Sequence, residues 1–248
     1  MKPLALLMLS PGTNNERETA WAFELAGARV EQHPLEGLLK NPAPLKRARI
    51  LMFPGGFSYG DDLGAGRIAA LGLRTALADA LRDHLRRGGL VMGHCNGFQI
   101  LVQSGLLPGI PGPRGGPAAT LALNARGRFE CRWVPLKVVT PGIFLRGLDE
   151  LELPIAHAEG RFLTASPEVL RTLRRNGQVA LAYRGRSPNG AEAGIAGITD
   201  PTGRVLGMMP HPERFLLREQ HPDWRRLGSL PREGLGLRVY RNAVEWLR

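Results

Sequence analysis

Residues 93–97 read Gly-His-Cys-Asn-Gly and place Cys95 between an apolar run at residues 90–92 and a helical stretch at residues 96–104. This strand–turn–helix order is the setting of a nucleophile elbow, in which a sharp turn exposes the reactive side chain. Glycines two residues before and after the nucleophile remove side chains that would collide there. The dipole of the following helix favours the thiolate form. The pattern favours a catalytic cysteine, with a buried structural cysteine as the alternative.

A thiolate nucleophile needs a base and a group that orients the base. Residues 208–214, Met-Met-Pro-His-Pro-Glu-Arg, can supply both, and they overlap an apolar strand candidate at residues 205–209. Side chains two positions apart in an extended segment project to one side, and each proline disfavours helix for the residue before it. We expect His211 and Glu213 to face one cleft, with the carboxylate holding the imidazole's tautomer. Without Cys95, the same segment fits a surface loop with incidental charges.

A third segment, residues 53–62, is a glycine-rich loop that closes the strand candidate at residues 49–53. Such loops often bind phosphate, but this one lacks the Gly-Lys-Ser/Thr of a nucleotide-binding loop. The backbone N–H groups of Gly56 and Phe57, together with that of Asn96, are expected to form an oxyanion hole. Ligands of open α/β sheets bind beyond the carboxyl ends of the strands. Since all three segments follow strands, one crevice is expected to gather them.

The elements that must position these groups begin with short apolar strands alternating with helices. The strand candidates are residues 3–9, 49–53 and 90–92, and the helix candidates are residues 14–28, 67–87 and 96–104. Asn14 or Asn15 is expected to cap the first helix. This alternation predicts an α/β fold with an open, mostly parallel sheet and helices on both faces.

Antiparallel additions are expected in the second half of the chain, after a loop at residues 109–116 that is rich in glycine and proline. The strand candidates there are residues 128–139, 179–183, 194–199 and 205–209. An Asp-Pro-Thr-Gly sequence separates the last two and predicts a hairpin. A terminal helix is expected over residues 237–247.

The composition of this 248-residue chain, 43% hydrophobic and 22% charged, is that of an ordinary globular protein, and we expect one domain over residues 1–248. Its two cysteines, Cys95 and Cys131, make neither a disulfide framework nor, unaided, a zinc site. A cytoplasmic protein without a bound metal is therefore expected. Residues 4–9 are too few to span a bilayer and are interpreted as a buried strand, so no membrane association is expected.

The net charge of +11 would attract nucleic acid or an acidic partner. The basic residues are dispersed, however, and aromatic residues make up only 6% of the chain. No tract interleaves aromatic with basic side chains, as in a protein that binds single strands. The sequence therefore disfavours nucleic-acid binding as the main function. It favours a solvated basic surface or a surface for acidic partners.

Together these segments resemble the class I, or triad, glutamine amidotransferases, and among them the glutaminase subunits of phosphoribosylformylglycinamidine synthase. The resemblance covers nearly the whole chain and implies a flavodoxin-like fold. The matching segments are residues 54–61, 95–101, 105–109, 129–132, 157–162, 188–190 and 208–214. The triad identifies only the class, whereas the Gly-Phe-Ser-Tyr-Gly-Asp, Cys-Asn-Gly-Phe-Gln and His-x-Glu-Gly-Arg-Phe motifs together are specific to these subunits.

The resemblance implies that Cys95 attacks the side-chain amide of L-glutamine, forms a γ-glutamyl thioester and releases ammonia before water yields glutamate. His211 would move the protons and Glu213 would orient it. The positions that match glutamine-holding residues of the family are Gln99, His157, Ala158 and Glu159.

Synthesis also needs ATP, and this chain has no phosphate-binding lysine motif. The resemblance therefore implies no cofactor here, with ATP and Mg²⁺ on a separate large synthetase subunit that receives the ammonia. That subunit would convert formylglycinamide ribonucleotide to formylglycinamidine ribonucleotide in purine biosynthesis. A small third subunit often bridges the two.

The chain departs from the family pattern at several positions. His94 stands where an apolar residue is usual; it either tunes the ionisation of the elbow thiol or packs beside it, and packing is the favoured interpretation. Gly64, Arg67 and Ser187 also differ, and residues 112–117 look like an insertion. None of these is expected to touch the triad.

Other functions fit less of the pattern. The first alternative is the glutaminase subunit of another amidotransferase or a related thiol hydrolase, which would not need the Gly-Phe-Ser-Tyr-Gly-Asp loop. A non-catalytic basic scaffold or nucleic-acid binder is the alternative from a different class. It would need neither the elbow nor the His-Pro-Glu segment.

Overall fold

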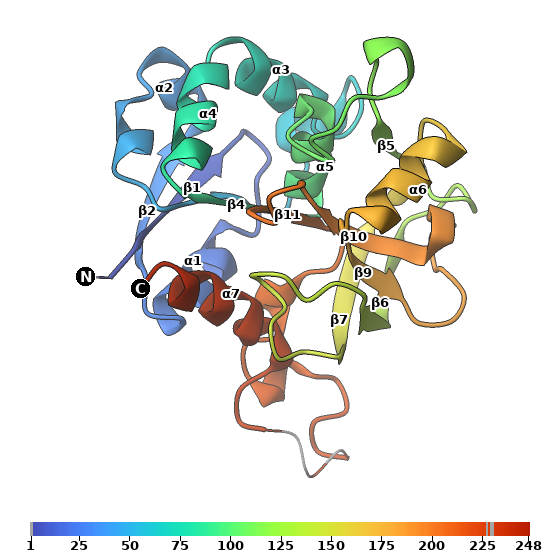
Figure 1. The fold of residues 1–248 in the computed structure, drawn as a ribbon. Helices are drawn as coiled ribbons and strands as arrows, with labels where there is room; N and C mark the ends of the chain where they lie inside the picture. The colour runs from blue at the N-terminus through green and yellow to red at the C-terminus, as the bar shows by residue number, and fades with distance from the viewer. Residues whose placement is uncertain (1, 227, 229–230) are drawn as a thin grey trace.

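A nine-stranded sheet forms the centre of the protein (Figure 1). The structure is a computed structural model that describes residues 2–226, 228 and 231–248. The strand order is β2-β1-β3-β4-β11-β10-β9-β6-β7. The strands are β1 (Leu4–Leu9), β2 (Arg29–Pro34), β3 (Ile50–Phe53), β4 (Leu90–His94), β6 (Glu130–Val138), β7 (Glu150–His157), β9 (Val179–Tyr183), β10 (Ile195–Thr199) and β11 (Val205–Met208). A separate antiparallel pair joins β5 (Ala119–Ala122) to β8 (Arg161–Thr164).

The first five strands of this order run parallel, as expected for the short apolar sequences of β1, β3, β4 and β11, while the polar edge strand β2 was not predicted. β3, β4 and β11 consist entirely of buried residues, which is why they read as continuous apolar runs. Phe53 at the end of β3 pairs with Gly93 of β4, and Met208 at the end of β11 pairs with His94. The carboxyl ends of these three strands therefore lie side by side, which brings together the three segments that follow them.

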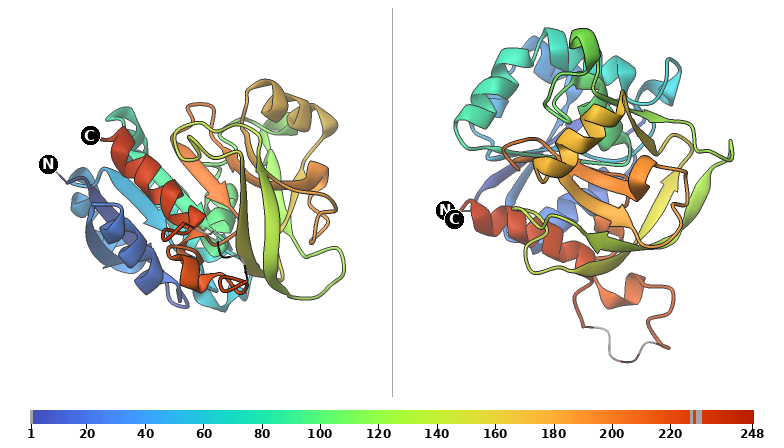
Figure 2. Two further views of the ribbon diagram at one scale, coloured as in Figure 1. Left: turned by 90° about the horizontal axis from the view of Figure 1, so that it is seen from below. Right: turned by 45° about the vertical axis from the view of Figure 1, so that its right-hand side comes forward.

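Helices cover both faces of the parallel half (Figures 1 and 2). The helices of the described residues are α1 (Glu16–Leu25), α2 (Leu35–Lys40), α3 (Arg67–Thr75), α4 (Ala78–Arg86), α5 (Asn96–Ser104), α6 (Pro167–Arg175) and α7 (Leu235–Trp246). α1 and α7 pack together on one face, while α3, α4 and α5 lie on the other (Figure 1). The predicted α/β architecture is confirmed.

The prediction of one continuous helix over residues 67–87 is wrong, because α3 and α4 are separate helices. Leu71, which the sequence places on the buried stripe, is 53% exposed, whereas Leu73, Leu77 and Leu81 are buried. Leu77 adopts a non-helical conformation at the junction (φ −108°, ψ 1°). Two short helices can each turn their own leucines inward, which one straight helix would not do.

The second half adds antiparallel strands to the sheet. β10 and β11 form the predicted hairpin, and the carboxylate of Asp200 accepts hydrogen bonds from the backbone of Thr202, Arg204 and Val205 in its turn. β9, β6 and β7 continue antiparallel beyond β10. Although β7 is last in the sheet order, it contacts the site segment after β11. Its Pro154 carbonyl oxygen accepts a hydrogen bond from the N–H of His211 at 2.9 Å.

Candidate active site

Cys95 lies on the sharp turn between β4 and α5. Its φ of 51° is a positive value that few residues other than glycine adopt. A Cβ atom at Gly93 would lie 2.6 Å from the carbonyl of Gly97, and a Cβ at Gly97 would lie 1.9 Å from the carbonyl oxygen of Phe53. The close approach predicted for the two glycines is confirmed. The turn is also tied to the neighbouring strand, because the N–H of Cys95 donates to Met208 O at 2.8 Å.

His211 and Glu213 follow β11 and form a buried pair. The His211 Nδ1 atom lies 2.6 Å from Glu213 Oε1, and the two side chains are only 2% and 0% exposed. Burial acts to lower the pKa of His211, but the charges of Glu213 and of the Cys95 thiolate outweigh it and raise the pKa to about 10. Burial acts to raise the pKa of Glu213, yet His211 and His94 bring it well below its usual value.

These shifts describe an ion pair at neutral pH, with His211 protonated and Glu213 ionised. The other ring nitrogen, Nε2, is buried and has no hydrogen-bond partner among the residues that the structure describes. Since Nδ1 is held by Glu213, Nε2 is the atom that can give a proton to a bound substrate or take one back. The structure therefore brings together the three side chains predicted as a triad.

Asn15 is a further member of this site that sequence reasoning missed. It occupies the N-cap position of α1, but its side chain makes no capping hydrogen bond. Instead, Nδ2 donates to Glu213 Oε1 at 3.2 Å and lies 3.0 Å from His211 Nδ1, while Oδ1 accepts from Arg214 at 2.8 Å. The predicted N-cap position is confirmed at Asn15, but the side chain does not cap the helix. The signal that could have identified Asn15 is its position after β1, because β1 is the neighbour of β3 in the sheet.

His94 contacts the triad, so the expectation that no departure from the family pattern does so is wrong. Its Nδ1 atom lies 3.3 Å from Glu213 Oε2 and 3.2 Å from the hydroxyl oxygen of Tyr240 in α7. The side chain is fully buried. Packing beside the elbow is therefore only part of its role.

The predicted oxyanion hole is reduced to two donors. The N–H of Phe57 donates to Gly12 O at 2.9 Å, so it is occupied within the protein. The N–H groups of Gly56 and Asn96 have no backbone acceptor in the described part of the chain. A Cβ at Gly56, whose φ is 152°, would lie 2.5 Å from Gly12 O, which explains the glycine there. The structure favours Gly56 and Asn96 over Phe57.

One amide joins the glycine-rich loop to the elbow. The Asn96 side chain accepts from the N–H of Ser58 at 3.1 Å and donates to Asp61 Oδ1 at 3.2 Å and to Gln99 Oε1 at 2.9 Å. Burial raises the pKa of Asp61, and the charge of Glu159 adds to the effect. Asn96 thus has a structural task besides its backbone N–H.

The four residues predicted to hold the substrate lie together, but several of their polar groups are engaged within the protein. Gln99 Nε2 donates to the carbonyl oxygen of Glu159, and the Ala158 carbonyl accepts from the N–H of Asn124 at 2.7 Å. The Glu159 carboxylate accepts from the N–H of Ala65 at 3.2 Å. In this conformation Gln99 and the 158–159 backbone build the wall of the site.

His157 retains a free polar atom. Its Nδ1 lies 3.1 Å from Asn124 Oδ1, while Nε2 is buried without a hydrogen-bond partner in the described chain. Burial, with the positive charge of His211, lowers its pKa to about 4, so the ring is neutral at pH 7. Gly160 is pressed against this ring, since a Cβ there would lie 2.2 Å from it.

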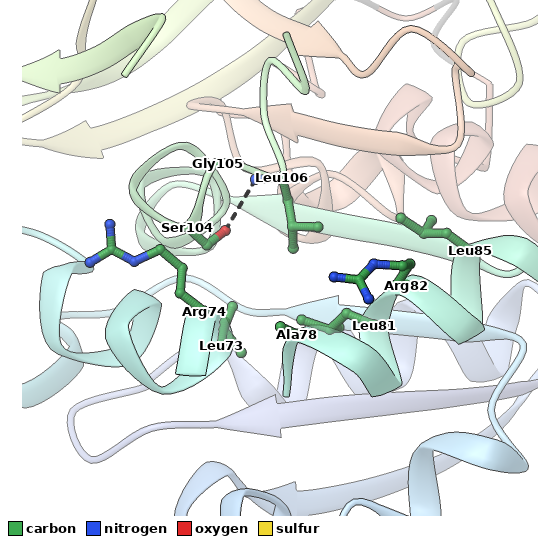
Figure 3. Close-up of a pocket in the computed structure, with 9 residues that line it drawn as sticks. All are labelled: Leu73, Arg74, Ala78, Leu81, Arg82, Leu85, Ser104, Gly105 and Leu106. Carbon is green, nitrogen blue, oxygen red and sulfur yellow. Dashed lines mark hydrogen bonds between the residues drawn. The ribbon is translucent and has the colours of Figure 1, made fainter. Parts of the chain in front are cut away.

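The triad is shielded from solvent in this conformation, because Cys95 is only 6% exposed. A cavity of about 330 Å³ lies elsewhere, between α3, α4 and the end of α5 (Figure 3). Four leucines line it together with Arg74 and Arg82, and it contains no predicted site residue.

The described residues hold neither a metal cluster nor a membrane-spanning helix. Among residues 2–226, 228 and 231–248, no group of three or more His, Cys, Asp or Glu side chains is arranged to hold a metal ion. Within the same ranges, every helix is too short or too polar to cross a membrane.

Comparison with known proteins gives a full-length match. The family described as "CobB/CobQ-like glutamine amidotransferase domain" matches residues 2–247. The subunit PurQ of phosphoribosylformylglycinamidine synthase from Dehalococcoides mccartyi is 44% identical, over 100% of this chain and 98% of that protein. The corresponding PurQ of Treponema denticola is 42% identical over 90% of this chain and 92% of its own length.

Solved structures give the same correspondence. The chain is similar to one in the structure of PurLQS from Thermotoga maritima, with a TM-score of 0.79, 30% identity and complete coverage of both chains. A glutamine amidotransferase from Methylobacillus flagellatus has a TM-score of 0.57 at 17% identity, over 100% of this chain and 94% of that one, and is similar in fold alone.

Proposed function

Because the chain belongs to the CobB/CobQ-like glutamine amidotransferases, and among them to the PurQ subunits of phosphoribosylformylglycinamidine synthase, we propose that it hydrolyses L-glutamine to supply ammonia to that synthase. The observation that carries the proposal is the position of Cys95, on a positive-φ turn beside the buried His211–Glu213 pair. A scaffold protein would need neither feature. The match over 98% of the PurQ subunit from Dehalococcoides mccartyi supports this subunit over a different amidotransferase or thiol hydrolase.

The first half of the reaction forms a thioester. The Cys95 thiolate attacks the side-chain carbonyl carbon of glutamine, and the negative oxygen of the tetrahedral intermediate receives hydrogen bonds from the N–H groups of Gly56 and Asn96. His211 gives its Nε2 proton to the amide nitrogen, the carbon–nitrogen bond breaks, and ammonia leaves. Glu213 keeps its negative charge and steadies the imidazolium ring.

The second half restores the enzyme. Neutral His211 takes a proton from water through Nε2 while the water oxygen attacks the thioester carbon. The carbon–sulfur bond then breaks, glutamate leaves, and the thiolate–imidazolium pair is present again. These residues need no cofactor for either half.

The ammonia is consumed elsewhere. We propose that a large synthetase subunit, which binds ATP and Mg²⁺, uses it to convert formylglycinamide ribonucleotide to formylglycinamidine ribonucleotide in purine biosynthesis. A small third subunit would bridge the two, in line with the PurLQS structure from Thermotoga maritima. Both cysteines are free thiols, which suits a cytoplasmic location. The shielded triad is consistent with glutamine entry that depends on movement when the partner binds.

Covalent labelling tests the proposal. The assembled complex is treated with diazo-oxo-norleucine, an electrophile that resembles glutamine, and the modified peptide is identified by mass spectrometry. We expect one label at Cys95 and protection by excess glutamine. Cys131 is an internal control, because it is an exposed free thiol. Labelling at Cys131 alone, or none at all, would overturn the proposal.

A further inference from the structure

A second buried histidine lies on the far side of the triad carboxylate. His94 ends β4 and is fully buried. Its Nδ1 atom lies 3.3 Å from Glu213 Oε2 and 3.2 Å from the Tyr240 hydroxyl oxygen. The ring meets that of Tyr240 edge-on, with centroids 5.6 Å apart and an interplanar angle of 87°. The reaction described above does not use this side chain.

The position of the carboxylate decides which nitrogen of His94 carries the proton. A lone pair on Nδ1 would face the negative Oε2 of Glu213 at 3.3 Å, which is repulsive in a buried site. A proton on Nδ1 turns the same contact into a charge-assisted interaction. Nε2 has no partner in the described chain, and leaving a lone pair there avoids a buried, unpaired N–H. The favoured tautomer of His94 therefore carries its proton on Nδ1, where the Tyr240 hydroxyl oxygen at 3.2 Å can accept as well.

Glu213 depends on this contact for its second oxygen. Oε1 accepts from His211 and from Asn15, whereas Oε2 makes no hydrogen bond in the described residues, and its ion-pair contact there is with His94 Nδ1 at 3.3 Å. Glu213 is 0% exposed, so water does not compensate. With only one oxygen held, the carboxylate could rotate about its last bond and lose its alignment with His211.

We propose that His94 is a positioning residue for the triad: its protonated Nδ1 faces Glu213 Oε2 across 3.3 Å and holds that oxygen by electrostatic attraction, while Tyr240 holds its ring in place. The proposal rests on the proposed function, because it concerns the same triad. It assigns a reason to a residue that stands where the family usually has an apolar side chain. It also gives α7 an indirect role in the reaction, because Tyr240 of this helix contacts His94.

The ionisable groups around this cluster come from every element packed on it. Cys95 follows His94, His211 shares Glu213, and His157 ends β7 nearby. Glu18 of α1 faces Tyr240; burial first, then the charges of Glu213 and Glu18, raises the pKa of that hydroxyl well above its usual value. Tyr240 therefore keeps its proton over the whole range in which the enzyme would be assayed.

The proton position can be tested without turnover. The isolated full chain is labelled with ¹⁵N-histidine, and the ring signals are assigned by loss in His94→Asn and His84→Leu variants. We expect His94 to carry its proton on Nδ1. His84 is the internal control with the opposite tautomer, because its Nε2 lies 3.0 Å from Leu90 O. A proton on Nε2 of His94 would overturn the proposal whatever the activities of the variants.

The effect on the triad is tested in the complex with its synthetase partner. His94→Leu should lower kcat for glutamine hydrolysis at least tenfold with a much smaller change in KM, because Glu213 does not touch glutamine. The acidic limb of the pH profile should move to higher pH, since Glu213 loses a donor that favours its charged form. His94→Asn, which keeps a donor near the Nδ1 position, should recover most of the rate.

Control variants separate positioning from stability. His84→Leu removes another buried histidine, which contacts the opposite end of β4, and should leave kcat and the pH profile unchanged. Loss of kcat in a folded His94→Leu protein by less than tenfold, or without movement of the acidic limb, would overturn the proposal. If the wild-type complex itself does not hydrolyse glutamine, the proposed function fails instead, and the tautomer result still decides the proposal.

Discussion

The N–H of Cys95 donates to the carbonyl oxygen of Met208 at 2.8 Å, at the end of the paired strands β4 and β11. This bond joins the nucleophile to the strand that delivers its base three residues later. The spacing between Cys95 and His211 is thus fixed by the sheet, and long loops between the two strands do not alter it.

Replacing the nucleophile should separate two activities. In the complex, Cys95→Ala should abolish synthesis that depends on glutamine and leave synthesis from added ammonium salt intact, because the second activity does not need the thiol. Both rates are measured by following formation of the amidine product. Cys131→Ala is the matched control and should leave both unchanged, since that thiol is exposed and outside the site. Equal loss of both activities in Cys95→Ala would make Cys95 structural.

Asn15→Ala should lower kcat for glutamine hydrolysis about tenfold or more, because Glu213 Oε1 and Arg214 both lose a hydrogen-bond partner. A loss of about 1–3 kcal/mol in the free energy of unfolding should accompany it, since buried polar groups are left unpaired. Asn14→Ala tests the neighbouring exposed position. It should change neither quantity by much, and similar losses in both variants would contradict a role specific to Asn15.

Gly97→Ala should prevent or strongly weaken folding. The added methyl group would lie 1.9 Å from Phe53 O, so strand and helix would have to separate. We expect a loss of about 3 kcal/mol or more in chemical denaturation. Gly37→Ala in α2 is the control, because nothing lies within 4 Å of its added Cβ and its φ is not positive. It should be neutral or stabilise the protein by up to about 1 kcal/mol.

The pKa of His211, raised to about 10, predicts how stability changes with pH. In the unfolded chain a histidine titrates near pH 6.5. The stabilisation from the charged ring is therefore fully present below about pH 6.5 and is lost as the pH rises through about 10. The stability difference between wild type and His211→Gln should shrink over this interval in denaturant titrations. A difference that stays constant to pH 10 would contradict an ion pair in the folded protein.

The elbow and its partners could be predicted because their signals are local. Glycines flank Cys95 within two residues, and apolar strands precede each of the three site segments. The turn between the antiparallel strands β10 and β11 could likewise be predicted from four consecutive residues that begin at Asp200. Because parallel strands end at the same edge of a sheet, the three segments that follow them could be expected to lie together.

Other features depend on contacts that no local pattern carries. The contact of β7 with His211 joins segments that are far apart in the sequence, although the alternating apolar residues Leu151, Leu153 and Ile155 could have identified the strand itself. α6 was missed despite Ser166 and Pro167, whose order is typical of a helix start. The contacts of Asn15 and His94 with Glu213 join residues about 200 and 120 positions apart, respectively, and only the folded chain brings them together.

The contact of β7 with the site also bears on how the protein is made. Cys95 Sγ contacts Ala156 O at 3.6 Å, His211 is held by Pro154 O, and Tyr240 of α7 completes the cluster behind Glu213. During translation Cys95 is synthesised first, whereas Ala156, His211 and Tyr240 are added only in the second half of the chain. A nascent chain that has not reached Tyr240 therefore lacks part of the cluster behind Glu213.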